Sequence, residues 1–258
     1  MSATPLDAYS IAWGLLMVAA VLGMNLWHRL GMERTLLLAA VRTVAQLTAV
    51  GFVIGWVFER SAWYLIVGLL VVMALVAAQA AAGRVRPRRR GMMLIFMATL
   101  TVVTLLTLLY VTQVVVGVHQ WEPQYLIPLG GIVLGNAMTA GSLAAERLLS
   151  EVTAKRVQIE SMLAMGARPA RAVLPQVRTA VRAAITPIVN SMMIVGIVKL
   201  PGIMTGQMLG GQGPLQASLY QMVVMFMIVF GDSMAAIVIV LVLRGRLFTH
   251  AAQLRPLE

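Results

Sequence analysis

Long apolar runs constrain this chain more than any other feature of its 258-residue sequence. Several of them reach roughly 18 residues, the length of a helix that crosses a bilayer core. Charged residues make up 11% of the chain, whereas a soluble domain carries about 25%. The sequence therefore predicts an all-α, polytopic membrane protein whose helices pack on one another inside lipid.

The apolar runs predict seven spanning helices in a single transmembrane domain over residues 1–258. The N-terminal segment MSATPLDAYS lacks a basic region, so we expect the first run to stay as an anchor and not to be cleaved. The sixth run is short and ends in proline and glycine, which predicts an irregular outer end. The predicted spans cover residues 8–27, 37–58, 63–82, 91–118, 125–144, 185–200 and 215–243.

Lysine and arginine residues set the predicted orientation, because cytoplasmic loops carry an excess of them. The loop GRVRPRRRG, residues 83–91, holds five arginines and is placed in the cytoplasm as a topology anchor, with a specific binding site as the alternative. Alternation then puts the N-terminus outside and the C-terminus inside. Of the 20 Lys and Arg residues, only Arg60 and Lys199 fall outside. The net charge of +11 thus indicates topology and contact with anionic lipid, and we expect no nucleic-acid partner.

One charged segment, about residues 145–184, interrupts the apolar pattern on the cytoplasmic side. Residues 144–159 contain helix formers without Gly or Pro and extend the fifth span, and Gly166 then ends the helix. Pro169 suits the first turn of the next helix. This pattern predicts two cytoplasmic arms joined by an elbow, which is either a solvated hairpin or a docking site for a soluble partner. The apolar tip of such a docking site comprises Met162, Leu163, Met165 and Ala167.

No motif in the chain supports catalysis. A P-loop is absent, because neither Lys155 nor Lys199 stands in the required glycine-rich context. The chain has no cysteine and three scattered histidines, so we expect neither thiol chemistry nor a histidine metal site within one helix. No Ser-His-Asp set or pair of carboxylates can be proposed. We therefore expect a chain that is not an enzyme and that binds no cofactor of its own.

Polar side chains within the spans are candidates for contact with a transported molecule, because they are costly in lipid. Helix breaks at Pro201, Gly202 and Gly206 predict a hinge that faces a cavity. The competing interpretations are helix packing for the small and amide residues, and core filling for methionines that could otherwise serve as soft metal ligands. The predicted lining residues are Asn136, Asn190, Ser191, Met192, Gln207 and Asp232.

Five segments of the chain resemble the FetB permease family. They cover most of residues 10–245 in order, and the pattern VxLPGxMxG is the most specific of them. FetB is the membrane subunit of a bacterial iron-export ABC transporter whose ATPase is FetA, and plant relatives are aluminium-tolerance permeases. The segments are RTVAQL (42–47), IPLGGIVLGNAM (127–138), IESMLAMGARPARA (159–172), RAAITPIVNSMMIVGIVKLPGIMTGQMLGG (182–211) and SLYQMVVMFM (218–227).

The resemblance implies a permease subunit of an ATP-driven exporter in the bacterial inner membrane, with iron or a related metal ion or chelate as cargo. Two permease copies would pair with two separate FetA-like ATPase subunits, which would bind the ATP and Mg. The resemblance leaves any metal ligands undefined. It further implies that the elbow couples to the ATPase through Glu160, Met162, Leu163, Met165, Gly166, Ala167, Arg168 and Pro169.

Two other functions compete with this interpretation. A secondary transporter or channel that needs no ATPase would predict paired intramembrane carboxylates or a recognisable repeat, and the sequence has neither. A non-transporting membrane scaffold would use the elbow only to recruit a partner. Copurification with an ATPase subunit distinguishes the exporter from both.

Overall fold

A computed structural model describes residues 8–60, 62–86, 91–115, 117, 122–249 and 251–255, with side chains from residue 13 onward. Helices make up most of this described part, and its β-structure is confined to two isolated bridges. The predicted all-α class is therefore confirmed. Arg88, Arg89 and Arg90 of the predicted cytoplasmic loop lie outside the described residues.

Five helices of the described chain are long and apolar enough to cross a membrane, which supports a multi-pass membrane protein. The first and sixth predicted spans fall on two further helices, α1 (Ala8–His28) and α8 (Leu174–Ile194), so the total of seven stays a prediction. The five are α2 (Glu33–Arg60), α3 (Trp63–Arg84), α4 (Met92–Tyr110) continued by the π-helix η1 (Val111–Val115), α5 (Pro123–Ala154) and α10 (Pro214–Arg246).

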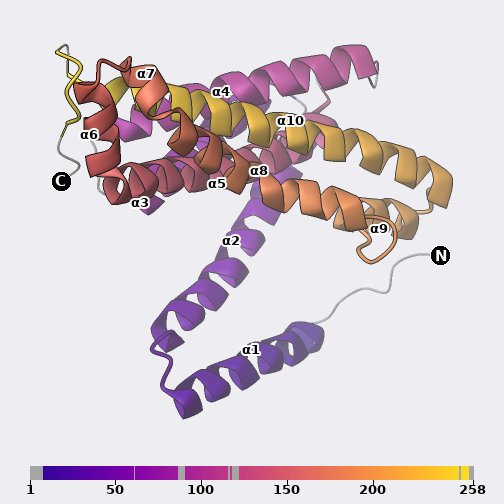
Figure 1. Cartoon of the computed structure of the whole chain (residues 1–258). Coiled ribbons are helices and arrows are strands. Elements are labelled where there is room, and N and C mark those ends of the chain that lie inside the picture. The colour runs from indigo at the N-terminus through magenta and orange to yellow at the C-terminus, as the bar shows by residue number, and fades with distance from the viewer. Residues whose placement is uncertain are drawn as a thin grey trace. The chain divides into compact units, whose positions relative to one another are not determined.

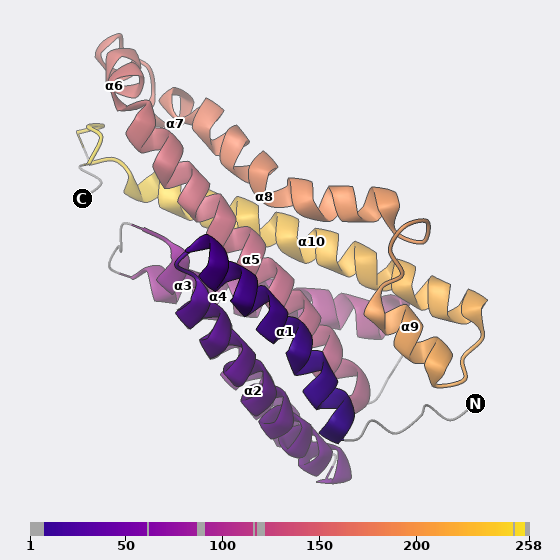
Figure 2. The same cartoon turned by 90° about the horizontal axis from the view of Figure 1, so that it is seen from below.

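The sixth predicted span, residues 185–200, falls on α8, which begins earlier, at Leu174, and ends earlier, at Ile194. The early start arises because the segment after α7 and the predicted span form one helix, which contains Pro187 and bends along its length (Figure 2). The early end arises because Gly196 takes φ +83, a conformation that stops a right-handed helix.

The chain divides into two compact units, each with its own packing. The smaller consists of the N-terminal part through Ala62 together with Leu209–Gly211. In it, α1 and α2 form a helical hairpin with few contacts between its two helices. The connection is short because Arg29 and Gly31, with φ of 50 and 71, reverse the chain directly after His28.

The larger unit is a bundle in which α5 and α10 form the central pair (Figure 1). Helices α3, α4 and α8 each pack against α5, and α4 and α8 also contact α10. Lipid tails are as apolar as the side chains, so association in a membrane depends on close packing, which small residues permit. The helices α3, α5 and α10 accordingly carry many buried alanines, namely Ala74, Ala77, Ala78, Ala81, Ala137, Ala140, Ala144, Ala145, Ala235 and Ala236.

Two glycines mark the closest approach between α5 and α10. A Cβ atom added at Gly141 would lie 2.5 Å from the Cδ1 atom of Ile239, and one added at Gly231 would lie 3.2 Å from the Cγ1 atom of Val133. No side chain larger than hydrogen fits at Gly141 without a shift of its neighbours. These contacts fix which faces of α5 and α10 meet.

Different short helices lie at the two ends of the larger unit. At one end lie α6 (Arg156–Ala164) and α7 (Pro169–Ala172), which connect α5 to α8. At the opposite end lies α9 (Gly202–Leu209), between α8 and α10 (Figures 1 and 2). The helices α5 and α8 therefore run from the elbow at one end toward the α9 segment at the other.

Candidate functional site

A cavity of about 420 Å³ lies inside the larger unit, near its α9 end. It brings together four of the residues predicted to line or hinge a cavity, namely Asn136, Ser191, Pro201 and Gly202. The remaining described residues that line it are Ile132, Ile188, Val195, Lys199, Ile203, Gln221, Val224, Met225 and Ile228. Its walls thus come from α5, α8, the segment after α8, α9 and α10.

Two polar side chains in this cavity were not singled out from the sequence. Gln221 is 5% exposed, and its Oε1 atom has no hydrogen-bond partner in the described chain. Lys199 follows α8 and lines the same cavity. The signal for Gln221 was available, because an amide within a spanning helix is costly unless it meets a partner or a ligand.

Asn136 has a defined orientation toward its own helix. Its Nδ2 atom donates a hydrogen bond to the carbonyl oxygen of Ile132 at 2.9 Å. The amide oxygen and the second N–H of Nδ2 are therefore the groups that Asn136 can offer to a ligand in the cavity. Ser191 adds a hydroxyl group from α8, which can either donate or accept.

Asp232 lies on the same face of α10 as the cavity-lining residues but one turn beyond them. Gln221, Met225, Ile228 and Asp232 follow one another at spacings of four, three and four residues, which keeps them on one side of a helix. Asp232 is 6% exposed, and its Oδ1 atom has no hydrogen-bond partner in the described chain. The carboxyl group is therefore a buried neighbour of the cavity and does not line it.

The other predicted lining residues lie elsewhere. Asn190 faces a second groove of about 710 Å³ between α8 and α10, together with Arg178 and Arg182. Met192 is half-buried against an apolar cluster, and so packs as core filling. Gln207 and the predicted hinge residue Gly206 lie within α9 and do not line the 420 Å³ cavity.

At the elbow end, α6 stops in a well-defined turn. The amide of Ala167 donates to the carbonyl oxygen of Met162 at 3.0 Å, and that of Gly166 donates to Leu163 at 2.9 Å. These two bonds, with φ +88 at Gly166, form a Schellman motif that satisfies the last carbonyls of the helix. Arg168 then precedes Pro169, which occupies the first turn of α7.

Two residues of the predicted apolar tip are turned toward the core. Met162 and Leu163 are half-buried and pack against the main core cluster of the larger unit. They follow Ile159, which is fully buried, by three and four residues, so the helical period directs all three inward. The large apolar side chains exposed on α6 and its turn are Val157 at 77% and Met165 at 78%.

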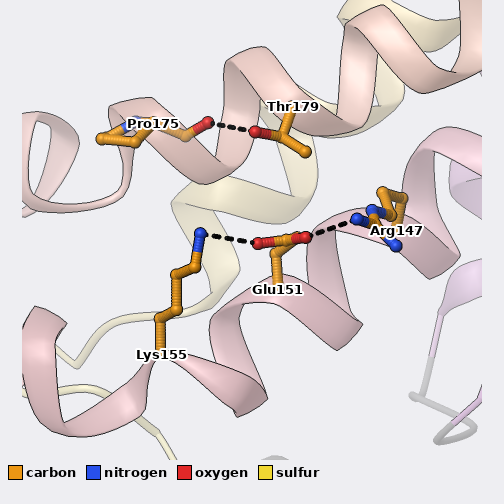
Figure 3. A network of polar contacts seen from close by, with 5 residues as sticks. All are labelled: Arg147, Glu151, Lys155, Pro175 and Thr179. Atoms are coloured by element: carbon orange, nitrogen blue, oxygen red, sulfur yellow. Dashed lines mark hydrogen bonds and ion pairs between the residues drawn. The ribbon is translucent and has the colours of Figure 1, made fainter.

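Ion pairs order the charged residues that lead into the elbow. Glu151 accepts from Arg147 at 2.7 Å and from Lys155 at 3.1 Å, and its side chain is 13% exposed. Figure 3 shows this carboxylate between the two cations, beside the turn of α8 in which Thr179 bonds to the carbonyl oxygen of Pro175. The predicted coupling residue Glu160 pairs with Arg156 at 2.8 Å.

No group of three or more His, Asp and Glu side chains in the described chain is placed to hold a metal ion. The 420 Å³ cavity instead offers an amide, a second amide oxygen, a hydroxyl and one ammonium group on apolar walls. Such a set binds by hydrogen bonds and a single charge. It contains no general acid–base pair and no nucleophile with a base.

Known proteins resemble this chain over nearly its whole length. A model of the uncharacterised protein family UPF0014 matches residues 8–248. A UPF0014 membrane protein of Synechocystis is 37% identical over 250 residues, which cover 96% of each chain. Protein ALUMINUM SENSITIVE 3 of Arabidopsis thaliana is 31% identical over 246 residues, 95% of this chain and 88% of that one.

A bacterial relative carries the name that the sequence motifs predicted. The Escherichia coli protein named "Probable iron export permease protein FetB" is 30% identical over 232 residues, 89% of this chain and 87% of its own. The predicted resemblance to FetB is thereby confirmed. No solved structure matches the chain.

Proposed function

Because this chain belongs to the UPF0014 family of membrane proteins, we propose that it is the permease subunit of an ATP-driven ABC exporter in the bacterial inner membrane. The proposed cargo is iron or a related metal ion or chelate, in keeping with the name of the Escherichia coli relative. A separate, FetA-like ATPase subunit supplies the ATP hydrolysis, and two permease copies form the membrane part.

The observation that carries this proposal is the path of α5 and α8. These two helices are joined by the elbow at one end, and both line the 420 Å³ cavity near the other end. From Asn136 to the end of α5 at Ala154 the helix extends ~27 Å at 1.5 Å per residue. From Leu174 to Ser191 the distance along α8 is similar, ~26 Å. Force applied to the elbow therefore reaches the cavity through α5 and through α8, which bends along its length.

The elbow is built as a rigid part and not as a loose loop. Ile159, Met162 and Leu163 anchor α6 on the core, and the Schellman motif closes its last turn. A displacement of the exposed turn therefore moves α5 and α8 together. In the proposed cycle, closure of the two ATPase subunits shifts the elbows of the permease dimer, and the cavity changes the side to which it opens.

Exposed apolar groups at the turn are the proposed contact with the ATPase. Met165 is 78% exposed beside Gly166, and a flexible thioether suits insertion into a partner's groove. Glu160 and Arg168 are exposed on either side of it and supply polar contacts around the methionine. The anionic lipid surface is a further partner for the arginines of the cytoplasmic loops.

The test is a comparison of Met165→Glu with Val157→Glu in the transporter copurified with its ATPase. Both side chains are exposed to the same degree, but only Met165 is in the turn. We expect Met165→Glu to abolish stimulation of ATP hydrolysis by the permease, and Val157→Glu to retain most of it. Equal activity of the two variants, or the absence of any copurifying ATPase, would contradict the proposal.

A cellular measurement tests the proposed cargo. Cells that lack the gene are expected to retain more iron than the parent strain under iron and peroxide stress. Complementation with the wild-type chain restores the lower content, whereas the Met165→Glu variant does not. An unchanged metal content in the deletion strain would exclude iron export.

A further inference from the structure

We infer that the 420 Å³ cavity between α5, α8, α9 and α10 is the cargo site and that it takes a small hydroxylated carboxylate anion, free or as its metal chelate, instead of a bare metal cation. This inference rests on the proposed transport function and specifies the chemical class of its cargo.

The charge of the cavity is the first argument. Lys199 is the one charged residue among the described residues that line it. An ammonium group beside a bound divalent cation would repel it. A carboxylate on the ligand reverses the sign of that interaction and forms a charge-assisted hydrogen bond.

The position of Lys199 is set by the backbone that follows α8. The amide of Gly196 donates to the carbonyl oxygen of Lys199 at 3.0 Å, and the amide of Lys199 donates to Ile194 at 3.3 Å. Gly196 has φ +83, which this tight turn requires. Val195 and Lys199 pair across the turn, and both line the cavity. The turn therefore holds the lysine at the cavity wall.

The unpartnered amide of Gln221 is the second, independent argument. Its Oε1 atom is an acceptor without a donor, and the side chain is 95% removed from solvent (5% exposed). A buried acceptor left without a hydrogen bond costs about 1–3 kcal/mol. Gln221 lines the cavity while its Oε1 atom is itself buried, so a hydroxyl group on the ligand would supply the missing donor once the side chain turns its amide toward the cavity. The amide oxygen of Asn136 and the hydroxyl of Ser191 provide further partners for such a group.

The walls and the size of the cavity fit a short carbon skeleton. Ile132, Ile188, Val224, Met225 and Ile228 supply apolar surface. Small-molecule sites range from about 300 to 1,000 Å³, so a volume of about 420 Å³ suits a compact molecule. A ligand with one carboxylate near Lys199, a hydroxyl at Gln221 and its carbons against the isoleucines matches all three features.

Binding to the full-length permease in nanodiscs tests the inference by isothermal titration calorimetry. The ligands are citrate, ferric citrate and Fe²⁺ alone. We expect citrate or ferric citrate to bind, and Lys199→Gln to weaken that binding about tenfold or more, as the loss of a charge-assisted hydrogen bond does. Gln221→Leu is expected to weaken it about fivefold or more.

Matched control variants come from the other end of the unit. Lys155 is the chain's second lysine and pairs with Glu151 near the elbow. Gln176 is 3% exposed with an unpartnered Oε1 atom, like Gln221, but does not line the cavity. Lys155→Gln and Gln176→Leu should therefore leave the affinity for citrate within about twofold, the range expected for a site they do not touch.

The possible outcomes separate this inference from the proposed function. Binding of both citrate and ferric citrate, or of either one, supports the inference and identifies the free anion or the chelate as cargo. Binding of Fe²⁺ alone, strengthened by Lys199→Gln, overturns it, as does equal weakening by the control variants. Failure of citrate binding in a permease that still stimulates its ATPase refutes the anion site alone. Loss of ATPase coupling with citrate binding intact refutes the exporter alone.

Discussion

The packing of α5 on α10 makes Gly141→Ala the most informative single change in the bundle. In a helix, Ala is more favourable than Gly by about 0.5–1 kcal/mol. The new Cβ atom, however, would lie 2.5 Å from the Cδ1 atom of Ile239 and 3.3 Å from the Cε1 atom of Phe96. Both neighbours are fully buried, so the Cδ1 methyl of Ile239 must shift within a packed core to make room. Overpacking of this kind costs about 1–3 kcal/mol.

Gly68→Ala is the matched control for this change. Gly68 also lies inside a spanning helix, α3, but nothing lies within 4 Å of an added Cβ atom. We expect Gly68→Ala to stabilise the protein by about 0.5–1 kcal/mol. The free energy of unfolding of Gly141→Ala should then lie about 1–3 kcal/mol below that of Gly68→Ala, because both gain the same helix propensity.

The assay is denaturant or thermal unfolding in detergent micelles, completed by a double-mutant cycle with Ile239→Val. Removing Cδ1 from Ile239 costs about 0.5–1.5 kcal/mol on its own. In the Gly141→Ala background it also removes the clash, so the double variant should be more stable than the sum of the single effects by at least about 0.5 kcal/mol. Equal stability of the two glycine variants, or strict additivity in the cycle, would refute the reasoning.

Three further changes test other parts of the structure. Gly166→Ala should destabilise the elbow turn by about 1 kcal/mol, because φ +88 disfavours a side chain, and faster proteolysis at the turn measures this; an unchanged cleavage rate would contradict the Schellman motif. Glu151→Gln should lower the free energy of unfolding by about 1 kcal/mol or less. This loss of stability should be smaller at about 1 M salt than at about 0.1 M salt, because salt screens the ion pairs of the wild-type protein. Asp232→Asn removes a buried, unpartnered carboxylate and should raise stability by about 1 kcal/mol, whereas a large loss of stability would reveal a partner that holds the charge.

Much of the elbow could be predicted because its determinants are local. Gly166 takes a left-handed conformation and Pro169 begins α7, as the order of these residues along the chain indicated. What the sequence could not decide was which apolar side chains face outward. Met162 and Leu163 suit either a core face or a docking tip, and they pack inward because α6 lies on the main core cluster.

The candidate site likewise combines residues that the sequence indicated with an arrangement that it could not predict. Asn190 and Ser191 are neighbours in sequence and equally polar, yet they line different spaces, because successive residues of a helix point about 100° apart. The alternation of the predicted spans places Lys199 on the outer side of the membrane, and only the turn at Gly196 brings it to the cavity wall. Gln221 joins them because α10 packs against α5 and α8.

The long apolar runs were enough to predict that this protein is helical and crosses a membrane, because a helix satisfies all the backbone hydrogen bonds of such a run in lipid. The family motifs and the helix-ending glycine were likewise readable without a structure. Which polar groups share a cavity could be seen only in the folded bundle. That outcome depends on which helix faces meet, and the faces meet where Gly141 and Gly231 allow α5 and α10 to approach closely, a contact between residues far apart in the chain.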